Sequence, residues 1–319
     1  MFDAETKRCH QPDVFIDVMK QRKIEGIDLT GDNLKLKLWY KKSVKESHAN
    51  ILLLHGGSYS TLAVFEPSEL FKNQYSLFNG FSQRGINVFG LDLNGYGFSE
   101  FLQSPHDINE YIKEIDIAIE FIKRYFIDLP IWILGWSFGA QLAARYSMNS
   151  IKSISGLIFY GGFWGGGIGG KPALFRENFC PPPESRRANR FEHVTGDFKT
   201  AGTFDPAYMS SFAEWALKID PSSPTVHLHE IVKVAPIHEP EKINIPTLIV
   251  HGENDLFARQ EDLMEYYLRL CTTNKNYVIF RNGDHNLHQG YQCIQWLEAV
   301  ARFINNDRTN TPGTVPQFI

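Results

Sequence analysis

The chain has few cysteines and no long apolar run. Its four cysteines, among 319 residues, are Cys9, Cys180, Cys271 and Cys293. They lie far apart and form no C-x-x-C pair, which argues against a disulfide framework and a metal site and fits a reducing compartment. No apolar run approaches the roughly 18 residues of a membrane span, and the opening MFDAETKRCH lacks a signal-peptide core. We therefore predict a cytoplasmic protein without a membrane span, although a non-standard export route stays open.

A strong excess of one charge is also absent. The chain has 32 Lys and Arg residues against 36 Asp and Glu residues, a net charge of −4. This balance gives no reason to expect a nucleic-acid partner. No glycine-rich phosphate loop lies between a strand and a helix, so we expect no dinucleotide and no other cofactor. The expected partner is a small-molecule substrate, and the protein is expected to be a monomer or a homodimer.

Short apolar runs alternate with amphipathic stretches along most of the chain. The apolar runs are 51–54, 86–91, 131–134, 154–160, 247–250 and 277–280. The clearest helix begins at Asp107, where Glu110 completes a pattern similar to a capping box. Two further runs, 24–29 and 34–40, flank a turn and predict an antiparallel hairpin at a sheet edge. Strands that alternate with helices predict an α/β fold with a mostly parallel central sheet.

The alternation stops after residue 160 and resumes near residue 244. The stretch between them opens with GGFWGGGIGG and contains one clear helix, capped by Asp205 and started by Pro206. Because a structureless loop of this length is unusual, we predict a helical cap inserted on a glycine-rich hinge after the sixth strand. A plain insertion that covers the sheet edge is the alternative. The predicted parts are an arm (1–22), a core (23–160 and 244–304), the cap (161–243) and a flexible tail (305–319).

Residues 135–139 read GWSFG and connect an apolar strand to a helical pattern. Strand, tight turn and helix are the context of a nucleophile elbow, in which the turn lifts the hydroxyl of Ser137 out of the sheet. The motif alone is weak, because glycine and serine are common. A nucleophilic serine also needs a base and an orienting carboxylate. Asp255 and His285 follow two later strands, and the carboxyl ends of parallel strands meet at one edge of the sheet.

This order of serine, aspartate and histidine resembles the α/β-hydrolase superfamily over about residues 24–304. Five features carry the resemblance: His55-Gly56-Gly57, Asp92-x-x-Gly95-x-Gly97-x-Ser99, Gly135-x-Ser137-x-Gly139, Gly252-x-x-Asp255 and Gly283-Asp284-His285. It implies the α/β-hydrolase fold, with Ser137 as nucleophile, His285 as base and Asp255 as orienting acid. It also implies an oxyanion hole formed by the backbone N–H groups of Phe138 and Gly57, with Ser58 as the alternative to Gly57. The predicted cap lies where many members of the superfamily carry a lid.

Several neighbouring polar residues are weaker candidates. His288 does not match the Gly-x-His position, and Glu253 does not occupy the fourth place of the acid pattern. Asp284 is interpreted as a carboxylate that fixes its loop. Side-chain to backbone hydrogen bonds that shape turns are expected of His55, Asp92 and His251. Surface positions are expected of His193, with substrate contact as the alternative, and of Arg186, Arg187 and Arg190, with carboxylate binding as the alternative.

Aromatic residues surround the predicted site. They are Tyr59, Trp136, Phe138, Phe163 and Trp164, of which all but Phe138 are assigned to the substrate pocket. Aromatic side chains there favour an apolar acyl or ring-bearing substrate, although some could belong to the core instead. We predict a serine hydrolase that cleaves an ester or thioester through an acyl-enzyme. The alternatives are C–C cleavage, lyase or cyclisation chemistry by the same triad, and a non-catalytic member that binds a small ligand.

Two features separate the chain from particular branches of the superfamily. Haloalkane dehalogenases and epoxide hydrolases use an aspartate nucleophile, whereas this chain has Ser137. Gly-Gly-Ser follows His55, in place of the Gly-Gly-Gly of hormone-sensitive-lipase-like esterases. This difference argues against a close kinship to those esterases.

Overall fold

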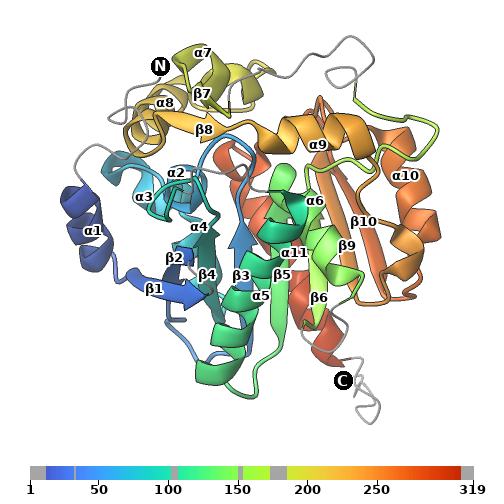
Figure 1. Cartoon of the computed structure of the whole chain (residues 1–319), viewed down its shortest axis with the longest axis horizontal. Coiled ribbons are helices and arrows are strands. Elements are labelled where there is room, and N and C mark those ends of the chain that lie inside the picture. Colours follow the sequence, from blue (N-terminus) through green and yellow to red (C-terminus); the bar gives the residue numbers. More distant parts are fainter. Residues whose placement is uncertain (1–11, 32–33, 102–106, 150–153, 173–184, 310–319) are drawn as a thin grey trace.

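A computed structural model describes residues 12–31, 34–101, 107–149, 154–172 and 185–309. At its centre is an eight-stranded sheet in the order β1-β2-β4-β3-β5-β6-β9-β10 (Figure 1). The strands are β1 (Glu25–Gly31), β2 (Leu34–Lys41), β3 (Ala49–Leu54), β4 (Ile86–Asp92), β5 (Ile131–Trp136), β6 (Gly156–Tyr160), β9 (Thr247–Gly252) and β10 (Lys275–Phe280). β1 and β2 form an antiparallel hairpin at one edge, and all neighbours from β4 to β10 are parallel. The predicted hairpin and mostly parallel sheet are confirmed, although Asp32 and Asn33 of the predicted turn lie outside the described residues.

Helices cover both faces of the sheet. They are α1 (Pro12–Gln21), α2 (Thr61–Phe65), α3 (Lys72–Tyr75), α4 (Leu77–Ser82), α5 (Ile108–Tyr125), α6 (Phe138–Ser147), α10 (Gln260–Arg269) and α11 (Cys293–Thr309), with short 3-10 turns at η2 (Glu69–Phe71), η5 (Pro240–Lys242) and η6 (Leu287–Gln289). In β3, Ile51 and Leu53 face a core shared with α1, α2, α4 and α11. Leu52 and Leu54 face the opposite core, shared with α5, α6 and α10. None of the helices in the described part of the chain is long and apolar enough to cross a membrane.

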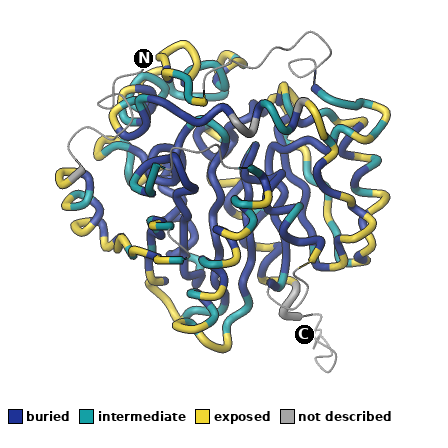
Figure 2. The backbone as a smooth tube through the Cα atoms, viewed as in Figure 1, coloured by how far each residue is buried: buried dark blue, intermediate teal, exposed yellow. Residues whose placement is uncertain are grey.

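The central strands are mostly apolar because both of their faces are covered. Every residue of β3, β4, β5, β6 and β9 is buried, as the dark tube in Figure 2 shows. The predicted capping box at the start of α5 is present. The Glu110 backbone N–H donates to Asp107 Oδ1 at 2.9 Å, and the Asp107 N–H donates to Glu110 Oε2 at 2.8 Å. The pattern of the sequence therefore specified both the buried strands and the start of this helix.

The segment 161–243, here called the insert, lies between β6 and β9. Besides η5, its described elements are β7 (Arg186–Ala188), α7 (Phe191–Val194), η4 (Thr195–Asp197), α8 (Pro206–Ile219), β8 (Ser222–Pro224) and α9 (Val226–Val234). They lie across the end of the sheet where β5 meets α6 (Figure 1). The helix predicted after Asp205 is α8, with the Ala207 N–H donating to Asp205 Oδ1 at 2.8 Å. The short strands and α9 were not predicted.

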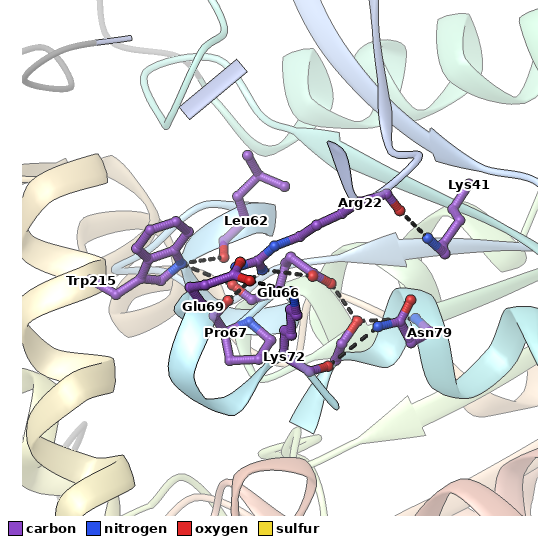
Figure 3. Close-up of polar contacts among 10 residues, drawn as sticks. Arg22, Lys41, Leu62, Glu66, Pro67, Glu69, Lys72, Asn79 and Trp215 are labelled. Atoms are coloured by element: carbon purple, nitrogen blue, oxygen red, sulfur yellow. Dashed lines mark hydrogen bonds and ion pairs between the residues drawn. The ribbon is translucent and has the colours of Figure 1, made fainter. Parts of the chain in front are cut away.

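A buried arginine ties the N-terminal part of the chain to the region where α8 packs (Figure 3). Arg22 donates to Glu66 Oε1 at 2.8 Å and to the Pro67 carbonyl at 2.6 Å. The Trp215 indole N–H on α8 donates to the Leu62 carbonyl at 3.1 Å and to the Glu66 carbonyl at 2.8 Å. The opposite charge of Glu66 and the hydrogen bond to the Pro67 carbonyl offset part of the cost of burying the guanidinium. The insert is therefore held against α2 at this end.

Candidate active site

Ser137 occupies a strained turn between β5 and α6. Its φ of +57° and ψ of −116° lie in a region that residues with a Cβ rarely adopt. The flanking glycines are needed because strand and helix nearly touch. A Cβ on Gly135 would lie 2.1 Å from the Gly139 carbonyl oxygen, and one on Gly139 would lie 2.3 Å from the Leu54 carbonyl oxygen. The G-x-S-x-G spacing is thus a packing requirement of this turn.

His285 and Asp255 are hydrogen-bonded to each other. His285 Nδ1 lies 2.9 Å from Asp255 Oδ2. The other carboxylate oxygen, Oδ1, accepts the backbone N–H groups of Phe257 at 2.8 Å and Ala258 at 3.2 Å. With Nδ1 as the donor, Nε2 carries the free lone pair of a neutral imidazole. Burial opposes the charged form of His285, but the Asp255 carboxylate outweighs it and raises the pKa of the imidazole above its usual value.

The loop that carries His285 is fixed by neighbouring side chains. The Trp136 indole N–H donates to the His285 carbonyl at 3.0 Å. The Phe257 ring lies against the imidazole, with their centroids 4.6 Å apart. Asp284 Oδ2 accepts the backbone N–H groups of Lys199 at 2.9 Å and Thr200 at 2.8 Å, so the predicted loop-fixing role of Asp284 is confirmed. These contacts hold the His285 loop and its imidazole in one orientation.

A cavity of about 340 Å³ brings the predicted residues together. Ser137 and His285 open onto it, and Asp255 lies behind the imidazole. The predicted pocket residues Tyr59, Trp136 and Phe163 line it. The rest of the apolar wall consists of Phe138, Leu228, Ile231 and Phe257. The cavity therefore offers an apolar space next to a serine hydroxyl and an imidazole.

The prediction that Trp164 lines the pocket is wrong. The Trp164 backbone N–H donates to Asp262 Oδ2 at 2.7 Å, and its indole N–H donates to the His238 carbonyl at 3.2 Å. The guanidinium of Arg269 lies over the ring, 5.2 Å from its centroid. These contacts turn the side chain toward α10 rather than toward the cavity, and Trp164 is absent from the cavity wall.

The two expected oxyanion donors lie at the same cavity as Ser137. Phe138 is the first residue of α6, where backbone N–H groups point out of the helix start. Gly57 follows β3, and the Tyr96 hydroxyl donates to its carbonyl at 2.9 Å. This bond fixes the orientation of the peptide that follows Gly57. Ser58, the alternative donor, also lines the cavity.

The other candidate histidines and carboxylates have structural roles. His288 Nδ1 lies 2.9 Å from the Tyr160 hydroxyl and Nε2 lies 3.2 Å from the Val64 carbonyl, and burial lowers its pKa to about 3. The expected turn-shaping contacts are present at three residues: His55 to Gly56 and Leu93, His251 to Gly252, and Asp92 to Thr61 and Phe98. Glu253 accepts the Asn282 N–H at 2.8 Å.

The expectation that the arginines of the insert form a solvated face holds only for Arg190, which is exposed. Arg186 donates to the Gly95 carbonyl at 2.8 Å and the Ser222 carbonyl at 2.7 Å. Arg187 donates to Ser58 Oγ at 2.8 Å and lines the cavity, as do His193 and Asp197. Asp197 was not singled out from the sequence, because no local motif marks it.

The insert is bonded firmly to the core. Buried Asp220 accepts the Ser60 backbone N–H, the Ser60 hydroxyl and the Gly97 N–H at 2.6 to 2.7 Å. At the glycine-rich entry, Asp262 accepts the N–H groups of Trp164, Gly165 and Gly167 at 2.7 to 3.0 Å. A hinge at this entry would have to break these bonds. These bonds favour an insert that is fixed on the core over one that moves on the predicted hinge.

Comparisons with known proteins identify the fold family. Residues 49–289 match the sequence model of a family described as alpha/beta hydrolase fold. A proline iminopeptidase from Saccharolobus solfataricus is 24% identical over 310 residues, covering 86% of this chain and 90% of the relative. The thioesterase domain from a curacin biosynthetic pathway has a TM-score of 0.58 at 20% identity, covering 88% of this chain and 99% of that one. A monoacylglycerol lipase from Paleococcus ferrophilus has a TM-score of 0.59 at 18% identity, covering 84% and 98%.

Proposed function

The chain belongs to the alpha/beta hydrolase fold family and is a hydrolase, and from this premise we propose that it is a serine hydrolase that cleaves an ester or thioester. The observation that carries the proposal is the hydrogen bond between His285 and Asp255 beside a cavity that also contains the strained Ser137. A serine hydroxyl becomes a nucleophile when a neutral imidazole accepts its proton.

The proposed reaction has two halves. Ser137 Oγ attacks the acyl carbonyl while His285 Nε2 takes the hydroxyl proton, and Asp255 balances the charge of the imidazolium. The imidazolium then protonates the leaving alcohol or thiol, which departs and leaves the acyl group on Ser137. Water, activated by the same imidazole, releases the acid and restores the serine. The backbone N–H groups of Phe138 and Gly57 would stabilise the oxyanion in both halves, each contributing about 3 kcal/mol to lowering the barrier.

The substrate is proposed to carry an apolar acyl chain or ring. Phe163, Leu228 and Ile231 contribute apolar surface to the cavity, and burial of such surface favours binding by about 25 cal/mol per Å². Two of these side chains come from α9. The insert is therefore proposed to act as a cap that sets substrate choice and keeps water from the reacting groups.

A substrate screen tests the proposal. We expect turnover of p-nitrophenyl esters of graded acyl length or of the matching acyl thioesters, with Ser137→Ala as the inactive control. Hydrolysis that persists in Ser137→Ala at the wild-type rate would contradict the proposal. Absence of turnover for the whole series, with Ser137 still reactive toward a phosphonate, would favour C–C cleavage, lyase or cyclisation chemistry instead.

A further inference from the structure

Asp197 differs from the other acidic residues where the insert meets the core. Asp220, Asp262 and Asp284 each accept three or more hydrogen bonds from neighbouring N–H and hydroxyl groups. Asp197 ends η4 and lines the cavity together with Ser137. Within the described ranges, no residue donates a hydrogen bond to its carboxylate or pairs with it as a cation.

Asp197 is half-buried, so its carboxylate has given up part of its hydration and gained no protein donor in return. Burial raises the pKa of Asp197, and the nearby His285 offsets this only in part. A half-buried carboxylate that lines a cavity and receives no hydrogen bond from the protein can accept one from a ligand. A ligand that brings its own hydrogen-bond donors would supply the missing partner.

A second polar group in the same cavity also lacks a partner. The hydroxyl of Tyr59 is buried and makes no hydrogen bond with the described residues, while its ring lines the cavity. A hydroxyl oxygen can accept a hydrogen bond from a ligand. On the same wall, Arg187 donates from Nη2 to Ser58 Oγ at 2.8 Å, while its Nε makes no hydrogen bond with the described residues. The two unpartnered groups that can accept a hydrogen bond are thus the Asp197 carboxylate and the Tyr59 hydroxyl.

We propose that Asp197 and Tyr59 form a subsite for a protonated amine of the substrate, so that Asp197 is a specificity-determining residue. An ammonium group has three donors and a positive charge, which complement a carboxylate and a neighbouring hydroxyl oxygen. This proposal rests on the proposed serine hydrolase function and names its substrate class: an ester or thioester with an amine separated from the scissile carbonyl by apolar atoms. An anionic group at the same place would be repelled by Asp197.

Paired esters test the subsite. Each pair has the same p-nitrophenol leaving group and acyl length, with an ammonium in one member and a methyl in the other: glycinate against propanoate, 3-aminopropanoate against butanoate, and 6-aminohexanoate against heptanoate. For at least one pair, we expect wild-type kcat/KM to be at least about 10-fold higher for the amine, which corresponds to about 1.4 kcal/mol. Asp197→Asn should lower kcat/KM for the ammonium ester far more than for its methyl counterpart, so that the preference for the amine is lost.

Control variants separate the subsite from general charge effects. Glu192→Gln removes the same charge from an exposed position of α7 that does not line the cavity, and it should keep the preference. Tyr59→Phe should reduce the preference by a smaller factor than Asp197→Asn. A wild type without any preference, or an Asp197→Asn variant that keeps it, would overturn the proposal. Turnover of the neutral esters in that case would leave the serine hydrolase function standing.

Binding measured without catalysis gives a second readout. By calorimetry, hexylammonium should bind the wild type at least about 10-fold more tightly than hexanol, and Asp197→Asn should bind both alike. Equal binding of the two ligands by the wild type would count against the amine subsite, whether or not any ester is hydrolysed. Loss of ester turnover together with retained hexylammonium selectivity would contradict only the hydrolase function.

Discussion

The two walls of the cavity are built in different ways. On the core wall, Ser137, Asp255 and His285 follow the ends of β5, β9 and β10, and their geometry depends on short turns. On the insert wall, Arg187 and Asp197 are placed by contacts between distant parts of the chain, such as Asp220 with Ser60. Under the proposed function, the first wall would carry out the nucleophilic reaction, and the second would discriminate between ligands.

We expect the largest loss of activity when Ser137, the proposed nucleophile on the core wall, is replaced. Ser137→Ala should lower kcat by about 10⁴-fold or more, and His285→Ala should cost nearly as much, because the triad residues act as a unit. Steady-state kinetics on the best ester of the screen measures both. A loss of only a few-fold in either variant would show that the core wall does not carry the chemistry.

Replacement of the orienting acid should have the next largest effect. Asp255→Asn should lower kcat by about 10³- to 10⁴-fold, since the imidazole loses its favoured tautomer.

His285 must be neutral to accept the serine proton, so activity rises as pH rises through its pKa. The Asp255 carboxylate raises that pKa, and the acidic limb of wild-type kcat/KM should lie above about pH 6.5. The limb should move to lower pH in Asp255→Asn. An acidic limb at the same pH in both proteins would contradict the assignment of this limb to a His285 imidazole whose pKa is raised by Asp255.

The attachment of the insert should affect stability more than chemistry. Asp220→Ala leaves three donors of Ser60 and Gly97 without a partner, and it should lower the free energy of unfolding by roughly 3 kcal/mol. Asp205→Ala removes only the cap of α8 and should cost about 1 kcal/mol. Denaturant unfolding compares the two variants. An equal, small loss for both would indicate that the insert is only loosely attached.

The smallest effects are expected where the insert contributes apolar surface. Leu228→Ala or Ile231→Ala should change the ranking of ester chain lengths by about 10-fold in kcat/KM, the range associated with one or two methylene groups. Trp164→Ala is the matched control, because its side chain is buried away from the cavity. It should lower the thermal midpoint and keep the wild-type ranking. If only Trp164→Ala changed the ranking of ester chain lengths, Trp164 would contact the substrate, and Leu228 and Ile231 would not select it.

The difference between the walls also explains what could be predicted from the sequence. The apolar strand, Gly135 and Gly139 mark the turn at Ser137 because the steric requirement acts over a few residues. Trp164 is near the site in sequence, yet Asp262, almost a hundred residues later, fixes its backbone and directs it elsewhere. The place of Asp197 at the cavity depends on the fold of the whole insert. Local patterns therefore specified the core wall, and long-range contacts decided the insert wall.

The most direct test of the account is the site of covalent reaction with a fluorophosphonate. Peptide mapping by mass spectrometry should find one adduct on Ser137 in the folded wild-type protein, none on Ser137→Ala, and much slower labelling of His285→Ala. Glu192→Gln, a change at an exposed position of the insert that does not line the cavity, should react at Ser137 at close to the wild-type rate. An adduct on another residue, or no adduct on a folded protein that hydrolyses esters, would contradict the assignment of Ser137 as the nucleophile.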